Sequence, residues 1–303
     1  MIELIRNPHI DFLGKKYIAF ALSGILSILG IIAIIQISKG HANLGIDFAG
    51  GTAIQLKFEK PIELHNIRLA LEKGGLKDFD LQDLPTENKI LIRMKKSEEK
   101  LGHVAEEITT ILSREFPENK YVVDSTTLIG PKVGGRLRED AAKAIAVAVI
   151  GLLIYVAFRF QIRFGIGATI ATFHDVLAVL GLFFIMGREI NLILVTALLT
   201  IAGYSLTDTV VVFDRIRENL KLKQKEDVQT VMNNSINEVL SRTIITSATV
   251  LFTSVALFLF GGEVIHDFSL AMIMGVIVGT YSSIFVASPV VLFWGGKRPF
   301  AKK

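Results

Sequence analysis

Hydrophobic positions in this chain gather into six long runs, and polar positions gather mainly into two segments between them. The runs carry few charges and cover residues 17–37, 141–158, 164–186, 190–213, 243–260 and 268–294. An α-helix of about 20 apolar residues crosses the hydrocarbon core of a bilayer. The pattern therefore predicts a polytopic α-helical membrane protein with six transmembrane helices, and the mean hydropathy of +0.50 agrees with that class.

The first polar segment follows the first apolar run and is typical of a small water-facing domain. Its periodicity and turn residues predict a strand over 44–59 interrupted at Gly50-Gly51, a helix over 62–73, and two strands within 79–94 around a turn at 85–88. A helix from an N-cap at Ser97 to Phe116 and a strand over 121–129 are predicted to follow. This order of strands and helices is typical of a ferredoxin-like α+β module. We therefore divide the chain into 1–38 (N-terminus and first span), 39–136 (the α+β domain) and 137–303 (a five-helix bundle).

The second polar segment, residues 215–241, mixes valine and leucine with lysine, glutamate, asparagine and glutamine. It is amphipathic and too polar to span a bilayer. We predict a helix that lies on the membrane surface.

Basic residues in the short connections lie almost entirely on one side of the predicted membrane. That side holds lysines and arginines near 6–16, 159–163, 215–225 and 297–303, whereas the short loops of the other side offer only Arg188. Basic loops face the cytoplasm. Both termini are therefore predicted to be cytoplasmic, and residues 39–136 extracytoplasmic. The net charge of +4 follows from this topology, so no nucleic-acid partner is expected.

Composition and motifs argue against enzymatic chemistry. The chain has no cysteine, so it forms no disulfide and holds no thiolate nucleophile or thiolate metal site. It also lacks a phosphate-binding loop and any metal-spaced cluster. No cofactor, metal or catalytic residue is expected, and energy for work must come from a gradient or a partner. The first apolar run is longer than a signal-peptide core, so we expect an uncleaved span.

Asp208 is the strongest candidate for a functional residue within a span. A charged side chain near the bilayer centre costs roughly 2.5–3.5 kcal/mol on insertion scales, so it usually faces protein or water. At 100° per residue, Asp208 shares a broad face with Thr200, Tyr204 and Thr207, which we expect to line the bundle interior. The alternative is a carboxylate that reaches the cytoplasmic edge, where Asp214 lies.

Arg242 begins the fifth span, and a line of hydroxyl residues follows it on the same helix face. Thr246, Thr249 and Thr253 lie four, seven and eleven positions further on. Such a stripe favours a hydrated path. Two simpler interpretations stay open, in which Arg242 is an ordinary cytoplasmic anchor and the threonines bond to their own helix.

His174 and Asp175 are adjacent ionisable residues in the middle of the third span. Adjacent side chains point about 100° apart, so we do not expect one partner to satisfy both. A proton relay and a buried structural hydrogen-bond pair are equally compatible with the pattern.

Small residues recur at every fourth position of the sixth span. Gly275, Gly279 and Ser283 form the centre of this stripe, between Ala271 and Ala287. Small residues let helix backbones approach closely, so the stripe predicts helix packing within the chain or on a partner. Pro289 is expected to kink or end that helix.

Several motifs together resemble the SecF family, the smaller membrane subunit of the bacterial SecD–SecF protein-export complex, related to the resistance-nodulation-division exporters. They are the glycine-rich run 45–51, Gly-Pro-Lys-Val-Gly at 130–134, His174-Asp175, the long run 203–219 in the fourth span, and 240–243 at the start of the fifth. The run 203–219 is the specific one. The resemblance covers nearly the whole chain.

The resemblance implies a protein of the bacterial cytoplasmic (inner) membrane that pairs with SecD and serves the Sec translocon channel and the exported unfolded polypeptide, in contact with membrane lipid. It implies use of the proton motive force in late steps of export, with Asp208 and Arg242 in proton transport. The resemblance implies an asparagine before this aspartate in many relatives, and Thr207 departs from that expectation.

Three alternatives stay open. Sodium ions could replace protons, because Asp208, threonine hydroxyls and backbone oxygens are suitable ligands for a hard cation. The chain could be half of a small-solute or lipid exporter of the same superfamily. It could also be a passive membrane scaffold whose polar residues hold helices together.

Overall fold

The computed structural model describes residues 9–77, 79–84, 88–94 and 103–295. The chain divides into two compact units. The smaller unit is Leu44–Lys143, and the larger one combines the segments before and after it. The predicted turn at 85–87, the predicted N-cap Ser97 and the terminal basic residues lie outside the described residues.

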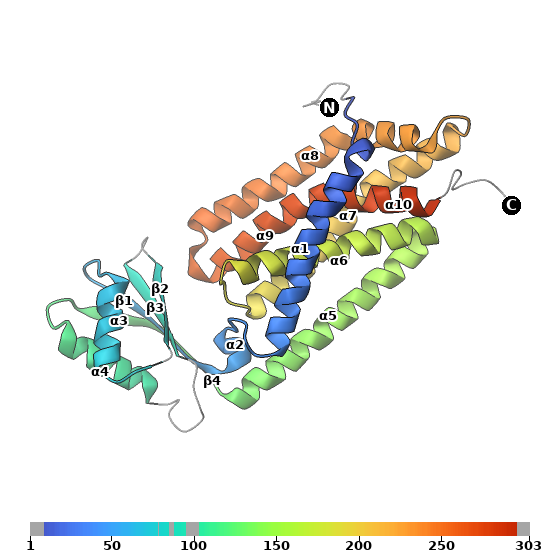
Figure 1. Ribbon diagram of the computed structural model, residues 1–303. Coiled ribbons are helices and arrows are strands. Elements are labelled where there is room, and N and C mark those ends of the chain that lie inside the picture. The colour runs from blue at the N-terminus through green and yellow to red at the C-terminus, as the bar shows by residue number, and fades with distance from the viewer. Residues whose placement is uncertain (1–8, 78, 85–87, 95–102, 296–303) are drawn as a thin grey trace. The chain divides into compact units, whose positions relative to one another are not determined.

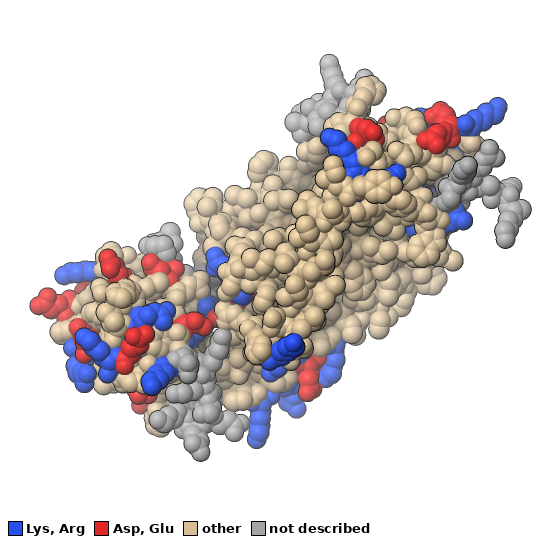
Figure 2. Space-filling view, viewed as in Figure 1, with Lys and Arg blue, Asp and Glu red and all other residues tan. Residues whose placement is uncertain are grey.

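In the part of the chain that the structure describes, six helices are long and apolar enough to cross a membrane, which confirms the predicted class. The six candidate spans are formed by α1 (Lys16–Ser38), α5 (Pro131–Arg159), α6 (Ile162–Ile185), α7 (Leu192–Leu222), α8 (Val228–Phe260) and the last span, α9 (Gly262–Ser282) with η4 (Ser283–Ala287) and α10 (Ser288–Gly295). A short helical turn, η1 (Leu13–Lys15), precedes α1. The visible flank of this bundle is almost free of charged side chains, which gather toward its ends (Figure 2).

The central helices of the bundle approach one another through glycine. A Cβ atom at Gly30 of α1 would lie 2.2 Å from the backbone oxygen of Leu177 in α6, and one at Gly181 would lie 2.7 Å from the nitrogen of Gly30. A side chain at either position would separate the two backbones. Figure 1 shows α1 crossing α6 along this contact.

The last span changes its helical form near Pro289 but does not end there. The α-helix passes into a π-helical segment, Ser283–Ala287, and then continues as α10. Proline lacks the N–H that an α-helix needs, and a π segment is one way for the chain to accommodate it. The Ser288 hydroxyl donates to the Ser283 carbonyl oxygen at 3.0 Å within this segment.

The predicted surface helix over 215–241 is wrong. Residues up to Leu222 extend α7, and α8 starts at Val228, so the two spans continue as an antiparallel hairpin. The apolar positions of the segment, including Val231, Ile236 and Leu240, are buried in the bundle core. The apolar faces of the α7 and α8 extensions therefore pack against each other and against the N-terminal segment rather than against lipid.

The hairpin is also held by polar contacts. Arg215 donates to Glu238 at 2.5 Å and to Glu218 at 2.8 Å. Asn219 donates to Ser235 at 3.0 Å and to Glu238 at 2.8 Å. The bonds to Ser235 and Glu238 join α7 to α8, so the two extensions are one connected structure.

The smaller unit contains the predicted α+β module. Its elements are α2 (Ile46–Ala49), β1 (Gly51–Phe58), α3 (Leu64–Lys73), β2 (Phe79–Leu84), β3 (Lys89–Met94), α4 (Val104–Glu115) and β4 (Tyr121–Ile129). The antiparallel sheet has the order β2-β3-β1-β4, which is the ferredoxin-like order. Apolar side chains of α3 and α4 cover one sheet face and form its core with Ile54, Ile92 and neighbouring residues.

One detail of the predicted strand over 44–59 is wrong. Residues Ile46–Ala49 form a single helical turn, and the strand begins only at Gly51. Gly50 has a φ of 75°, a conformation that favours glycine, and it ends the turn. A Cβ atom there would lie 3.0 Å from Pro131, the first residue of α5, so the glycine also permits this close approach.

Candidate functional site

Asp175 of α6 is the centre of a buried polar cluster inside the bundle, and its side chain is fully buried. Its Oδ1 atom lies 2.8 Å from Nδ1 of His174. Its Oδ2 atom accepts hydrogen bonds from the hydroxyl of Ser282, at 2.7 Å, and from that of Ser205. Three groups from three helices therefore satisfy one carboxylate, which is the arrangement that a buried charge requires.

Ser205 and Ser282 bond to Asp175 and not to His174 among the described contacts, in line with the expectation that one partner does not satisfy both residues. The two side chains bond to each other although they are neighbours in the sequence. Nε2 of His174 is buried and has no hydrogen-bond partner among the described residues. His174 and Asp175 therefore form a buried hydrogen-bonded pair, in which one ring nitrogen has no partner among the described residues.

Asp208 of α7 is also buried, with 6% of its surface exposed. Ser283 of η4 interacts with its carboxyl group. The Oδ2 atom is nevertheless buried without a hydrogen-bond partner in the described part of the chain. The side chain is therefore enclosed by the bundle rather than exposed to solvent, and an under-satisfied carboxyl group lies one helical turn from Ser205.

The predicted interior face around Asp208 is only partly correct. Tyr204 is half-buried, and its hydroxyl donates to Ser247 of α8 at 2.9 Å. Thr200 and Thr207 are exposed on this chain. The Thr207 hydroxyl donates to the Gly203 carbonyl oxygen, and that of Thr200 donates to the Thr196 carbonyl oxygen. The inward face of α7 instead carries Ser205, Asp208 and Thr209.

Arg242 and the threonines that follow it lie on the exposed side of α8. The hydroxyl of Thr246 donates to the carbonyl oxygens of Arg242 and Thr243, and those of Thr249 and Thr253 bond one turn back in the same way. Among the described residues no ion pair or hydrogen bond joins Arg242 to Asp208. Within this chain, the threonine hydroxyls therefore bond to their own helix, which is the simpler of the two interpretations of the stripe.

Gly275 and Gly279 show the predicted helix packing and place it within the chain. A Cβ atom at Gly275 would lie 2.4 Å from Ile201 of α7, and one at Gly279 would lie 3.3 Å from the Cβ of Ser205. Ser283 continues the stripe and bonds to Thr209 at 3.0 Å. The stripe is therefore covered by α7. Its neighbour is a helix of this chain and not a helix of a partner, which were the two possibilities expected.

Several hydroxyl residues of this region were not predicted from the sequence. Ser205 and Ser282 bind Asp175, and Ser247 accepts hydrogen bonds from Tyr204 and from Thr280, the latter at 2.7 Å. The only sequence feature that could have indicated them is a serine or threonine inside an apolar run. This feature is a weak indication, because such hydroxyls usually bond to their own helix. In the described part of the chain, no group of three or more His, Cys, Asp or Glu side chains is arranged to hold a metal ion.

Comparison with known proteins gives the family of this architecture. Residues 109–297 match the C-terminal region of the protein export membrane proteins SecD/SecF, and residues 42–62 match the SecD/SecF GG motif. The chain is 59% identical to the protein translocase subunit SecF of Thermodesulfovibrio yellowstonii, over 97% of this chain and 98% of that protein. The chain belongs to the SecF family.

Other SecF relatives and solved structures agree. The SecF subunit of Calditerrivibrio nitroreducens is 46% identical, over 96% of each chain. The crystal structure of SecDF, a translocon-associated membrane protein from Thermus thermophilus, superposes with a TM-score of 0.81 at 37% identity. It covers 95% of this chain, and this chain spans 39% of the SecDF chain. SecDF in a super-membrane-facing form superposes with a TM-score of 0.71. The buried cluster therefore belongs to a multi-pass SecF-family membrane protein.

Proposed function

We propose that this chain, together with SecD, uses the proton motive force to promote late steps of protein export through the Sec channel. The observation that carries the proposal is the Oδ2 atom of Asp208, which is buried inside a membrane bundle without a hydrogen-bond partner among the described residues. An ionised, unpaired carboxylate in such a place is costly, so a bound proton or cation stabilises it. Asp208 is the proposed site of proton binding.

Asp175 has a different role in this proposal. Its two oxygens are already bonded to His174, Ser205 and Ser282. It therefore anchors α6 to α7 and to the last span, and it lies beside the Asp208 region through Ser205. The Nε2 atom of His174 has no hydrogen-bond partner among the described residues, so His174 is the group of this pair that is proposed to exchange a proton.

Pairing with SecD accounts for the polar surfaces that this chain leaves uncovered. Thr207 on α7, and Arg242, Thr246 and Thr249 on α8, are all exposed. Hydroxyl and guanidinium groups facing lipid are unfavourable, so a second bundle or a hydrated path between bundles is their proposed neighbour. The solved SecDF chain is long enough to supply a second half, since this chain spans 39% of it.

Coupling requires a change in the distance between Asp208 and Arg242. In this structure the two residues form no ion pair, so the proposed conformation is one in which the carboxyl group is protonated. A bundle motion that brings the guanidinium closer favours release of that proton. Each charge that crosses about 100 mV supplies roughly 2.3 kcal/mol, which is available to move the extracytoplasmic domain along an emerging unfolded polypeptide.

The test is preprotein export into inverted membrane vesicles that contain the full translocase, under an imposed pH or sodium gradient. Asp208→Asn keeps the shape of the side chain and removes its titration, so gradient-stimulated export is expected to be lost. Asp208→Glu, the matched control, retains a carboxyl group and should retain part of the stimulation. Co-purification with SecD checks that each variant assembles.

Each outcome identifies a different function. Loss of stimulation with intact assembly supports the proposal, and the effective gradient identifies the ion as H⁺ or Na⁺. Unchanged export by Asp208→Asn contradicts the proton site. Loss of assembly together with export supports a scaffold role, in which the polar residues only hold helices together.

A further inference from the structure

Two buried oxygen atoms on adjacent helices of the bundle have no hydrogen-bond partner among the described residues. One is Oδ2 of Asp208 on α7, and the other is Oγ1 of Thr243 on α8. The two residues are 6% and 1% exposed. A buried polar atom without a partner is unfavourable, so a hydrogen bond to each of these oxygens would stabilise the bundle.

Thr243 differs from most other hydroxyl residues of α8. Four of them donate to a carbonyl oxygen of their own helix: Thr246, Thr249, Thr253 and Ser254. Such a bond is the usual one for serine and threonine within a helix. The Thr243 hydroxyl makes no bond of this kind in the described part of the chain, so it is available to another helix.

Ser247 shows which residues of the neighbouring helices lie at the same depth in the bundle. It accepts hydrogen bonds from Tyr204 of α7, at 2.9 Å, and from Thr280 of α9, at 2.7 Å. Because α7 and α8 are antiparallel, one turn forward on α7 lies opposite one turn back on α8. Residues four apart are one turn apart on the same helix face. This register places Asp208 opposite Thr243.

The hairpin end of the two helices keeps the same register. Arg215 of α7 donates to Glu238 of α8 at 2.5 Å. Asp208 and Thr243 lie between this bond and the bond to Ser247, so the two helices are joined on both sides of them. Their depths in the bundle therefore match.

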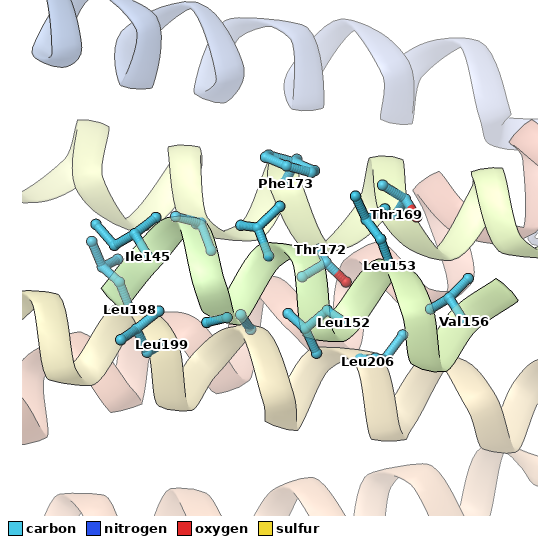
Figure 3. A pocket seen from close by; sticks show the side chains of 14 residues that line it. Ile145, Leu152, Leu153, Val156, Thr169, Thr172, Phe173, Leu198, Leu199 and Leu206 are labelled. Carbon is cyan, nitrogen blue, oxygen red and sulfur yellow. The ribbon is translucent and has the colours of Figure 1, made fainter. Parts of the chain in front are cut away.

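The opposite side of α7 offers Asp208 no polar partner. Leu206 lies two positions before Asp208, so it points about 200° away from it around the helix. Together with Leu152 and Val156 of α5, it lines an apolar cleft (Figure 3). A partner for Oδ2 is therefore expected from the side of α6, α8 and the last span, where Ser283 interacts with the carboxyl group.

The titratable groups that act electrostatically on Asp208 are already engaged in other hydrogen bonds. Asp175 of α6 is bonded through both of its oxygens, one of them to His174, and the Tyr204 hydroxyl of α7 donates to α8. On α8, the charged neighbour of Thr243 is Arg242, which is exposed. Thr243 is thus the residue of α8 that faces Asp208 with an unengaged group.

We propose that the Thr243 hydroxyl becomes the hydrogen-bond partner of Asp208 when its carboxyl group ionises, and that it positions the carboxylate for proton release. This inference rests on the proposed function, in which Asp208 binds and releases a proton. The unbonded atoms of this structure correspond to the protonated state, and the bond forms on ionisation. A donor to the carboxylate stabilises its ionised form, so Thr243 facilitates loss of the proton.

The test is infrared difference spectroscopy of the full chain with SecD in lipid, as a function of pH. The carboxyl band that Asp208→Asn removes reports proton binding at Asp208 without any need for export. Thr243→Val keeps the shape of the side chain and removes the hydroxyl, Thr243→Ala is a second variant without it, and Thr243→Ser retains it. Ser254→Ala is the matched control, because Ser254 is buried on α8 and bonds to its own helix. Co-purification with SecD checks assembly.

We expect both hydroxyl-free variants to raise the pH midpoint of the Asp208 band by about one unit, which is a roughly tenfold tighter binding of the proton. Thr243→Ser and Ser254→Ala should keep the wild-type midpoint. An unchanged midpoint in both hydroxyl-free variants, or an equal shift in Ser254→Ala, would overturn the role of Thr243 and leave the proton site standing. If no band depends on Asp208, the proton site itself is wrong, and this inference with it.

Discussion

Two asparagines fasten the segment before the first span to the α7–α8 hairpin. Oδ1 of Asn233 accepts hydrogen bonds from the backbone N–H groups of Phe12 and Leu13, at 2.9 and 3.3 Å, and its amide donates to the Ile10 carbonyl oxygen at 2.9 Å. Asn237 bonds to both backbone groups of Ile10, at 3.1 and 2.9 Å. The side-chain amides of the two asparagines thus satisfy backbone groups that a neighbouring strand would otherwise satisfy.

Asn233→Ala is therefore expected to destabilise the protein. It leaves the Phe12 and Leu13 N–H groups without their acceptor, at a cost of about 1–3 kcal/mol. The measurement is thermal unfolding in detergent, together with hydrogen exchange of the Phe12 and Leu13 amides, which should become faster. Asn234→Ala is the control, because Asn234 is exposed on the same helix. Equal melting temperatures for the two variants would contradict the role of Asn233.

At the scale of elements, glycine sets the distance between α9 and α7. The Cβ atom of an alanine at Gly275 would lie 2.4 Å from the side chain of Ile201, which is itself fully buried. Gly275→Ala should therefore force the helices apart or move Ile201, at a cost of about 1–3 kcal/mol.

Gly203→Ala is the matched control for this prediction. Gly203 lies in α7, and apart from its chain neighbours and the nearby backbone of its own helix, no atom of the described residues lies within 4 Å of the position that a Cβ would take. An added methyl group therefore meets no other helix. This variant should unfold at or above the wild-type temperature, because alanine favours helix more than glycine does. If thermal unfolding shows Gly275→Ala to be as stable as Gly203→Ala, α9 and α7 are not in tight contact at Gly275.

At the scale of the whole molecule, the orientation in the membrane can be measured directly. The chain has no cysteine, so single cysteines can be introduced without a background. Lys225→Cys lies in the turn between α7 and α8, and Glu118→Cys lies on the surface of the α+β unit. With intact cells, an impermeant maleimide should label Glu118→Cys alone, because basic loops stay in the cytoplasm.

Inverted vesicles provide the reciprocal measurement. There the same reagent should label Lys225→Cys and spare Glu118→Cys. Labelling of Lys225→Cys in intact cells would contradict the predicted cytoplasmic termini, since an even number of spans places the termini and this turn on one side.

The fold was largely predictable because its signals are local. Apolar length predicted the six spans, and alternating patterns with turn residues predicted the order of the α+β module. The errors arose where a local pattern had two solutions. An amphipathic segment such as 215–241 can pack its apolar face against lipid or against another helix. The presence of α8 beside α7 determines that it packs against a helix.

The candidate site was predictable only in part. Asp208, His174 and Asp175 stand out because ionisable groups are rare within spans, and all three are buried. Which groups surround them depends on helices far apart in the sequence. Ser205 and Ser282 reach Asp175 from two other helices, and no periodicity within α6 indicates them.

The sequence by itself determined the class of protein, the number of spans and the presence of charged groups in them, because burial in lipid selects residues one segment at a time. The tertiary structure alone decided that Gly275 faces α7, and that Asp175 is satisfied while Oδ2 of Asp208 has no hydrogen-bond partner among the described residues. These features depend on distances between helices, which are set by side chains of several segments at once.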